Sequence, residues 1–278
     1  MSISTTMNLR RTTVVGFICV VIATSFLQAS DPPATQPVVP QLSSESSVDD
    51  VLDALEARGK SLVGLQATIE KADVDVAGGD QTARRGTVFV SLANDQPRMR
   101  VSFDSLQRND NPPRTGDSVK QDYLLLGEWL IERNFDIKKV VRYQVRKPGE
   151  VVNLLSLTDG PFPLPVGQSR QSVYAQFDVK LLPTPEDRPG VIVLDLRPKP
   201  DSRLRRKFAR IIVDVDTSIS MPVRIETMDR DIDDANDPPS LINVTTLKDL
   251  KLNVAFDAAV FAEDGTEGWD VESKALND

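Results

Sequence analysis

Histidine is absent from the 278-residue chain, and cysteine occurs once, at Cys19. Without histidine the chain lacks the commonest general base near neutral pH, the commonest metal ligand and the usual partner of a serine or cysteine nucleophile. Cys19 lies in an apolar run near the N-terminus, so a chain that loses this run has neither thiolate nor disulfide, and its fold depends on packing alone. We therefore expect no enzyme, no cofactor and no metal ion.

Motifs that could supply catalysis are incomplete. Gly59-Lys60-Ser61 resembles the end of a phosphate-binding loop, but the first glycine of that motif would fall at Ala54. Residues 167–171, Gly-Gln-Ser-Arg-Gln, lack the second glycine of a serine elbow. No two carboxylates flanked by apolar residues suggest an acid–base couple. A hydrolase is the minor alternative.

Positive charge is in deficit, with 33 basic residues against 41 acidic ones and a formal net charge of −8. Nucleic acid is a poor partner for such a surface. One basic run is the exception, and it is either a solvated turn or a dock for an acidic partner or anionic lipid head groups. The run comprises Arg203, Arg205, Arg206, Lys207 and Arg210.

The acidic residues near position 230 resemble the start of a calcium loop. Asp229, Asp231 and Asp233 have the required spacing, but Asp234 replaces the glycine and Ser240 replaces the closing glutamate. An acidic hairpin tip is the simpler interpretation.

The N-terminal thirty residues predict a secretory signal peptide. Arg10 and Arg11 precede an apolar run over 14–27, which ends in small residues. The run is shorter than the roughly 20 residues that cross a bilayer, so a permanent anchor is the weaker alternative. We expect a signal peptide over 1–30, a disordered Pro/Ser-rich linker over 31–46 and a single domain over 47–278. The mature protein is then periplasmic and monomeric.

The domain begins with a helical pattern. Ser47 and Asp50 form a capping box, and apolar residues then recur at helical spacing on one face. The pattern predicts one amphipathic helix from Val48 to Lys71. Gly59 and Gly64 inside it predict a bend or a close contact.

After residue 79 the apolar residues alternate with polar ones, which predicts strands in an antiparallel meander. The alternation is clearest over 172–181, and 108–116 reads as a mobile loop between strands. Such a sheet needs its apolar face covered, and the helix from Val48 and the segment 154–164 are the candidate covers. The predicted strands are 87–92, 98–103, 122–126, 129–135, 139–145, 172–181, 191–197, 209–216, 222–229 and 241–252, with turns at 94–97 and 127–128.

Taken in order, several short motifs resemble the outer-membrane lipoprotein carrier family, whose members are called LolA-like, and its lipoprotein-binding sensors. Gly127-Glu128-Trp129-Leu130-Ile131-Glu132 resembles the family's strand pair, and Gly160-Pro161-Phe162-Pro163-Leu164-Pro165 stands at its lid segment. The other matching segments are 51–69, 86–90, 97–101, 193–198, 208–216, 221–225 and 256–271. Gln96 precedes Pro97 where the family's carriers have an arginine that latches the lid, which indicates a divergent member.

The resemblance implies an α+β fold in which a curved antiparallel sheet forms an incomplete β-barrel, with its concave face covered by the N-terminal helix and short lid helices. It also implies transport of lipoprotein acyl chains or lipid in that apolar space. Plain core packing is the alternative for every residue of the expected cavity, because both share one sequence pattern. An envelope sensor or scaffold that binds a protein partner is the alternative function. The expected cavity residues are Val88, Val90, Met99, Val101, Phe103, Trp129 and Ile131 on the sheet, and Leu55, Leu62, Leu65 and Phe162 on the cover.

Overall fold

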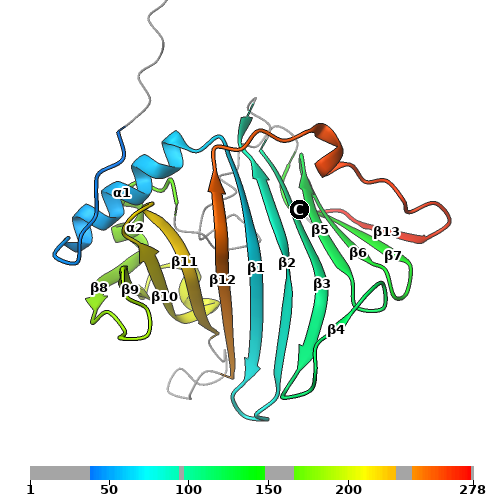
Figure 1. Cartoon of the computed structure of the whole chain (residues 1–278), viewed down its shortest axis with the longest axis horizontal. Helices are drawn as coiled ribbons and strands as arrows, with labels where there is room; N and C mark the ends of the chain where they lie inside the picture. The colour runs from blue at the N-terminus through cyan, green and yellow to red at the C-terminus, as the bar shows by residue number, and fades with distance from the viewer. Residues whose placement is uncertain (1–37, 94–96, 148–165, 230–239, 277–278) are drawn as a thin grey trace, which may run out of the picture. The chain divides into compact units, whose positions relative to one another are not determined.

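A single open sheet organises the molecule. The computed structural model describes residues 38–93, 97–147, 166–229 and 240–276. In this part of the chain the sheet has 13 strands in the order β13-β7-β6-β5-β3-β2-β1-β12-β11-β10-β9-β8, with β4 beside β3 (Figure 1). Neighbouring strands are antiparallel except for β13 and β7, which are parallel. The predicted signal peptide, the segment 154–164, Phe162 and the acidic tip at 230–239 lie outside the described residues.

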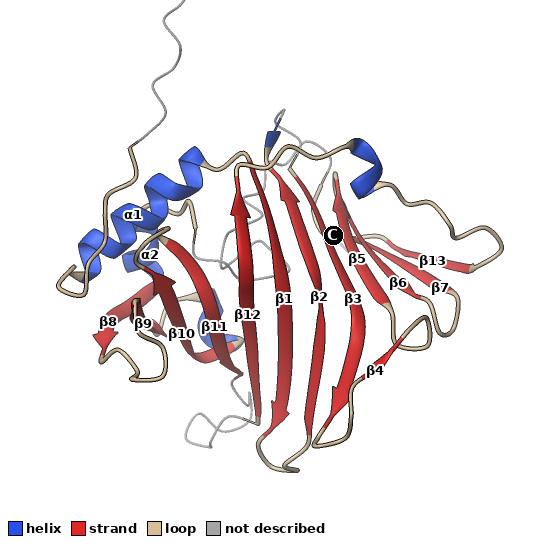
Figure 2. Ribbon diagram, viewed as in Figure 1, coloured by secondary structure: helices blue, strands red, loops and turns tan. Residues whose placement is uncertain are grey.

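The elements follow each other along the chain as two meanders. The strands are β1 Gly64–Asp75, β2 Gln81–Ser91, β3 Arg98–Arg108, β4 Arg114–Thr115, β5 Gln121–Leu126, β6 Trp129–Asn134, β7 Lys139–Gln144, β8 Phe177–Leu182, β9 Val191–Pro198, β10 Phe208–Asp216, β11 Met221–Asp229, β12 Leu241–Leu252 and β13 Asp270–Lys274. The helices are α1 Val48–Ser61 and α2 Arg170–Gln176, with 3-10 turns η2 Arg203–Arg206 and η3 Ala258–Phe261. Figure 2 shows the helices beside the sheet. The predicted α+β class and the open antiparallel sheet are confirmed.

The long helix predicted over 48–71 is wrong in its second half. The capping box of Ser47 and Asp50 is present, but α1 ends at Ser61 and β1 begins at Gly64. From Leu65 to Ile69 apolar and polar residues alternate, and β1 pairs with strands on both sides. The spacings of three residues from Leu62 to Leu65 and of four from Leu65 to Ile69 fit a helix. Hydrogen bonding from two neighbouring strands outweighs that local preference.

The strand predicted over 172–181 is wrong in its first half for a similar reason. Residues 170–176 form α2, which Ser169 caps by accepting a hydrogen bond from the Ser172 N–H. Val173 and Phe177 are both buried and lie four residues apart, a spacing that suits a helix as well as alternation suits a strand. The strand β8 therefore begins only at Phe177. The segment predicted as a loop over 108–116 contains the two-residue strand β4.

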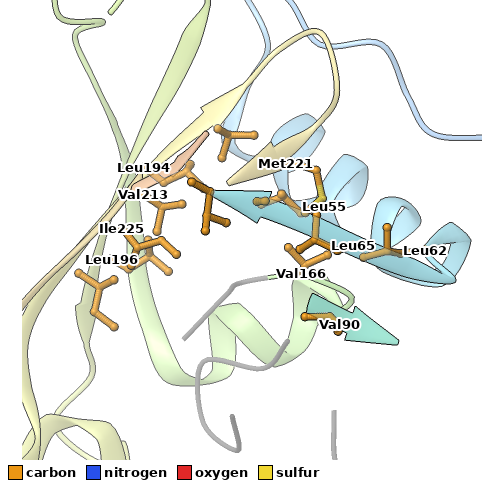
Figure 3. Close-up of a cluster of buried hydrophobic side chains, with 14 of the residues drawn as sticks. Leu55, Leu62, Leu65, Val90, Val166, Leu194, Leu196, Val213, Met221 and Ile225 are labelled. Carbon is orange, nitrogen blue, oxygen red and sulfur yellow. The ribbon is translucent and has the colours of Figure 1, made fainter. Parts of the chain in front are cut away.

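The two faces of the sheet carry different side chains. We call the face with Leu65, Val90 and Met99 the inner face; together with α1 it contributes to the main hydrophobic core (Figure 3). Leu42 lies in the stretch whose composition predicts a linker, and its side chain is buried in this core. The opposite face, which carries Phe89 and Leu124, is called the outer face. None of the described helices is long and apolar enough to cross a membrane.

The C-terminal segment 253–276 crosses the outer face and is called the strap. Phe256 lies edge-on to Phe89, at 5.8 Å between ring centroids, and edge-on to Phe261 at 5.9 Å. Trp269 packs on Leu124 and its buried neighbours in β6 and β7. The strap ends as β13 beside β7, so it connects the central strands to one edge of the sheet (Figure 1).

Beneath the strap lies a buried ionic cluster centred on Asp122, whose side chain has no exposed surface. Asp122 accepts hydrogen bonds from Arg133 at 2.5 Å, from Arg100 at 2.7 Å and from Ser102. The same two arginines donate to strap carbonyls, Arg100 to Val260 at 3.0 Å and Arg133 to Asp264 at 2.8 Å. The cluster thus joins the strap to the sheet. Burial raises the pKa of the Asp122 carboxyl, but the hydrogen bonds and the two positive charges outweigh this and hold its pKa below the ordinary value.

We predict that Asp122→Asn destabilises the protein by about 3–5 kcal/mol at pH 7, because it leaves the buried Arg133 charge without its partner. Since the folded pKa lies below the unfolded one, the contribution of Asp122 is complete above about pH 4 and is lost as the pH falls through the folded pKa. Denaturant unfolding between pH 3 and 7 measures both effects. The exposed Asp104→Asn on β3 is the control, and equal free energies for the two variants would contradict the prediction.

Candidate functional site

The strand register assembles an apolar row across the inner face. Cα partners run from Leu252 through Leu65, Val90, Met99, Leu125 and Leu130 to Tyr143, one residue each from β12, β1, β2, β3, β5, β6 and β7. At about 4.8 Å between strands, seven strands span roughly 29 Å. The bilayer core is about 30 Å thick and two chains deep, so one acyl chain needs about 15 Å. The row is long enough for such a chain.

Five of the predicted cavity residues lie together on this face. Val90 and Met99 belong to the row, Val88 and Val101 form the next pair, and Phe103 stands opposite Gly86. A Cβ at Gly86 would lie 1.8 Å from the Ser102 carbonyl oxygen, so only glycine fits beside this strand. All five apolar side chains are at most 4% exposed. The chain itself therefore fills or covers this part of the face.

Other predicted cavity residues are placed elsewhere. Trp129 stands opposite Leu126, and Ile131 opposite Leu124, which puts both predicted residues on the outer face with Trp269 of the strap. Leu65, expected on the cover, is a sheet residue of β1, while Leu62 is the C-cap residue that follows α1.

The inner face of the β5–β6 hairpin instead carries Tyr123, Leu125 and Leu130, which were not among the predicted cavity residues. The two-residue turn at Gly127-Glu128 fixes the register, so counting outward from it separates Leu125 and Leu130 from Trp129.

The helix α1 covers the apolar part of the inner face. Its Leu55 is buried in the main core, as is Val166 (Figure 3). The Gly167 N–H donates to the Leu55 carbonyl at 3.1 Å. A Cβ on Gly59 would lie 2.2 Å from the Gly167 Cα, so the absence of a side chain allows the two segments to touch. This contact is the reason for a glycine inside the helix, and the expected close approach at Gly59 is confirmed.

The far end of the inner face is polar. Lys71 forms an ion pair with Asp73 at 2.8 Å, and Lys71 stands opposite Arg84 of β2. Tyr123 lies 3.5 Å from the Glu132 carboxylate. Burial, and then the negative charge of Glu132, raise the pKa of Tyr123 to about 12. The inner face thus changes from apolar near α1 to charged at the other end of β1.

The basic run forms a turn between β9 and β10, but one member is separate from it. Arg210 forms an ion pair with Asp195 at 2.7 Å, which raises the pKa of Arg210 above its ordinary value. Arg203, Arg205 and Arg206 belong to η2, and Lys207 ends it. Among the described residues no group of histidine, cysteine, aspartate or glutamate side chains has the arrangement of a metal site.

No protein-family model and no curated protein matches the chain. Among solved structures it is similar to an outer membrane lipoprotein-sorting protein domain from Vibrio parahaemolyticus, with 14% identity, a TM-score of 0.36 and coverage of 76% of this chain and 94% of the other. A LolA superfamily protein from Nitrosomonas europaea has 14% identity, a TM-score of 0.30 and coverage of 78% and 98%. MucB in the MucA/MucB complex of Pseudomonas aeruginosa has 12% identity, a TM-score of 0.41 and coverage of 78% and 61%. At identities of 12–14% these are similarities between structures alone, and they say nothing of ligand or partner.

We predict that Gly59→Ala destabilises the protein, although alanine favours a helix by about 1 kcal/mol over glycine. The added methyl group overlaps the Gly167 backbone and must push α1 away from the core. Thermal unfolding measures the sign. Lys60→Ala, at the next and exposed position, is the control and is expected to change the midpoint little. A raised midpoint for Gly59→Ala would show that the contact is loose.

Proposed function

We propose that the protein is a carrier that binds the acyl chain of a lipid or lipoprotein on the inner face, beneath α1. The observation that supports this most is the apolar row, which continues across seven strands of the inner face. Each methylene group removed from water on such a face contributes about 0.8 kcal/mol. An acyl chain cannot cross an aqueous compartment without a cover of this kind.

Binding in this proposal requires a movable cover, because the central residues of the row, Leu65, Val90, Met99 and Leu125, are already buried. The polar contacts between α1 and α2 are suited to repeated opening. Arg170 forms ion pairs with Asp49 at 3.1 Å and with Asp53 at 3.2 Å, and the three side chains are 42–53% exposed. Tyr174 donates to Asp49 at 2.7 Å. Exposed ion pairs contribute only up to about 1 kcal/mol each, so α1 is held mainly by apolar contact that an acyl chain can replace.

The alternative function is an envelope sensor or scaffold on the same fold. The observation that favours it is the burial of Val90 and Val101, whose side chains are fully covered by other parts of the protein. A closed core of this kind needs no ligand to be stable. Native mass spectrometry of protein purified from its own host separates the two functions, since a carrier is expected to retain acyl chains.

We predict that Leu125→Ala and Leu124→Ala each cost about 2–5 kcal/mol of stability, because both leucines are buried. Only Leu125 lies on the inner face, so only its variant is expected to change the affinity for a fluorescent C16 fatty acid, by about tenfold or more. The adjacent Leu124 is the matched control. Equal affinities for the two variants, or no uptake by the unaltered chain, would count against the carrier.

We predict that Arg170→Gln speeds uptake of the same fatty acid by up to about fivefold, because it removes both α1–α2 ion pairs. Stopped-flow fluorescence measures the rate. Lys60→Gln removes the ion pair with Glu56 within α1 and leaves the α2 contact intact, so it is the control. Identical rates in the two variants would show that α1 does not move during binding.

A further inference from the structure

The turn between β9 and β10 concentrates positive charge on an otherwise acidic chain. Arg203 and Arg206 are exposed, Arg205 is partly exposed, and Lys207 follows them. In a 3-10 helix residues three apart lie above one another, so Arg203 and Arg206 share one side of the turn. We call these four residues the cationic turn.

The cationic turn is fixed from below by buried residues. Leu204 and Phe208 both belong to the main hydrophobic core, and Ser202 caps the turn by accepting from the Leu204 N–H. The Lys207 ammonium lies 4.9 Å from the centre of the Phe208 ring. The charges are therefore presented by a rigid segment of the fold.

In the described part of the chain, none of the four has a carboxylate within 4 Å. Nearby arginines differ: Arg197 and Arg210 both pair with Asp195. Burial raises the pKa of the Asp229 carboxyl, and the positive charge of Lys207 opposes this with a smaller lowering effect. The three arginines thus keep their charge available to a partner from outside.

We propose that the cationic turn docks on the anionic head groups of a lipid bilayer, where the carrier would collect or deliver its cargo. The role of docking in cargo exchange rests on the proposed function, whereas the attraction of the cationic turn to anionic head groups does not depend on it. A bilayer surface offers many negative charges at no fixed spacing, so it needs no shaped pocket on the protein. Each basic residue near such a surface contributes about fivefold in partition coefficient, so the three arginines contribute about a hundredfold.

Vesicle sedimentation of the full chain tests this inference. The chain is mixed with vesicles of phosphatidylglycerol and phosphatidylcholine, or of phosphatidylcholine alone, at low salt and at 0.5 M salt. The variant replaces Arg203, Arg205 and Arg206 by Gln. The control replaces Arg108, Arg114 and Lys251 by Gln as well. These three residues are exposed and lack ion pairs within the described residues, and their replacement changes the net charge of the chain as much as the triple-arginine variant does. The N-terminal apolar run is the same in every chain and cannot create a difference between them.

The unaltered chain and the control are expected to bind anionic vesicles and to lose binding at high salt, while the triple-arginine variant binds about a hundredfold less. Equal loss in the control, or no preference for anionic vesicles, would overturn the inference. So would an acidic protein that the unaltered chain binds through these arginines in place of vesicles. Fatty-acid uptake, measured in parallel, is expected to be unchanged in the variant, so failure of docking and failure of the carrier are separate results.

Discussion

The pairing of β1 with β12 joins the two halves of the sheet. One half, β2 to β7 with β13, follows β1 along the chain, and the other, β8 to β12, ends in β12 nearly 180 residues after β1 begins. Among the strands that the structure describes, no other neighbouring pair connects the halves. Closing so long a loop costs entropy before any contact compensates it. The inner face is continuous only because this ladder forms, and the row from Leu252 to Tyr143 depends on it.

The strap stabilises the same arrangement from the outer face. It leaves β12 at Asn253, whose N–H donates to the Gly64 carbonyl at 2.7 Å, and crosses to β7. A Cβ at Gly64 would lie 2.2 Å from the Val254 carbonyl oxygen, so the glycine allows the strap to lie against β1. Asp122 and its arginines then secure the strap over the other half. The outer face beneath the strap is thus occupied by structural contacts, and the binding that we propose uses the inner face.

Sequence reasoning located most strands because alternation reports which face a residue occupies, and long ladders reinforce it. It failed at 62–71 and 172–176, where spacing alone fits both helix and strand. What decides those segments is distant: β12 pairs with β1, and Val173 packs in a core built from remote strands. The same limit applies to the site. Val88, Val90 and Val101 were predicted to lie on the face that binds in our proposal, and the register places them there. Trp129 was predicted to lie on the same face but lies on the outer one, because the prediction followed the resemblance without counting register from the turn.

A carrier must release its cargo as well as bind it, and for this reason burial of the apolar side chains on the inner face is compatible with the transport that we propose. An acyl chain in a bilayer is already shielded from water, so its transfer to an apolar face gains little free energy. In the carrier that we propose, α1 is shielded from water whenever it is closed, and the incoming acyl chain restores apolar burial that opening of α1 removes. If α1 and an acyl chain bury similar apolar area on the inner face, exchanging one for the other changes the free energy little, and the exchange is reversible. An empty, permanently open cavity would expose apolar surface to water, at a cost the chain avoids by using Val51, Leu52 and Leu55 as its own cover.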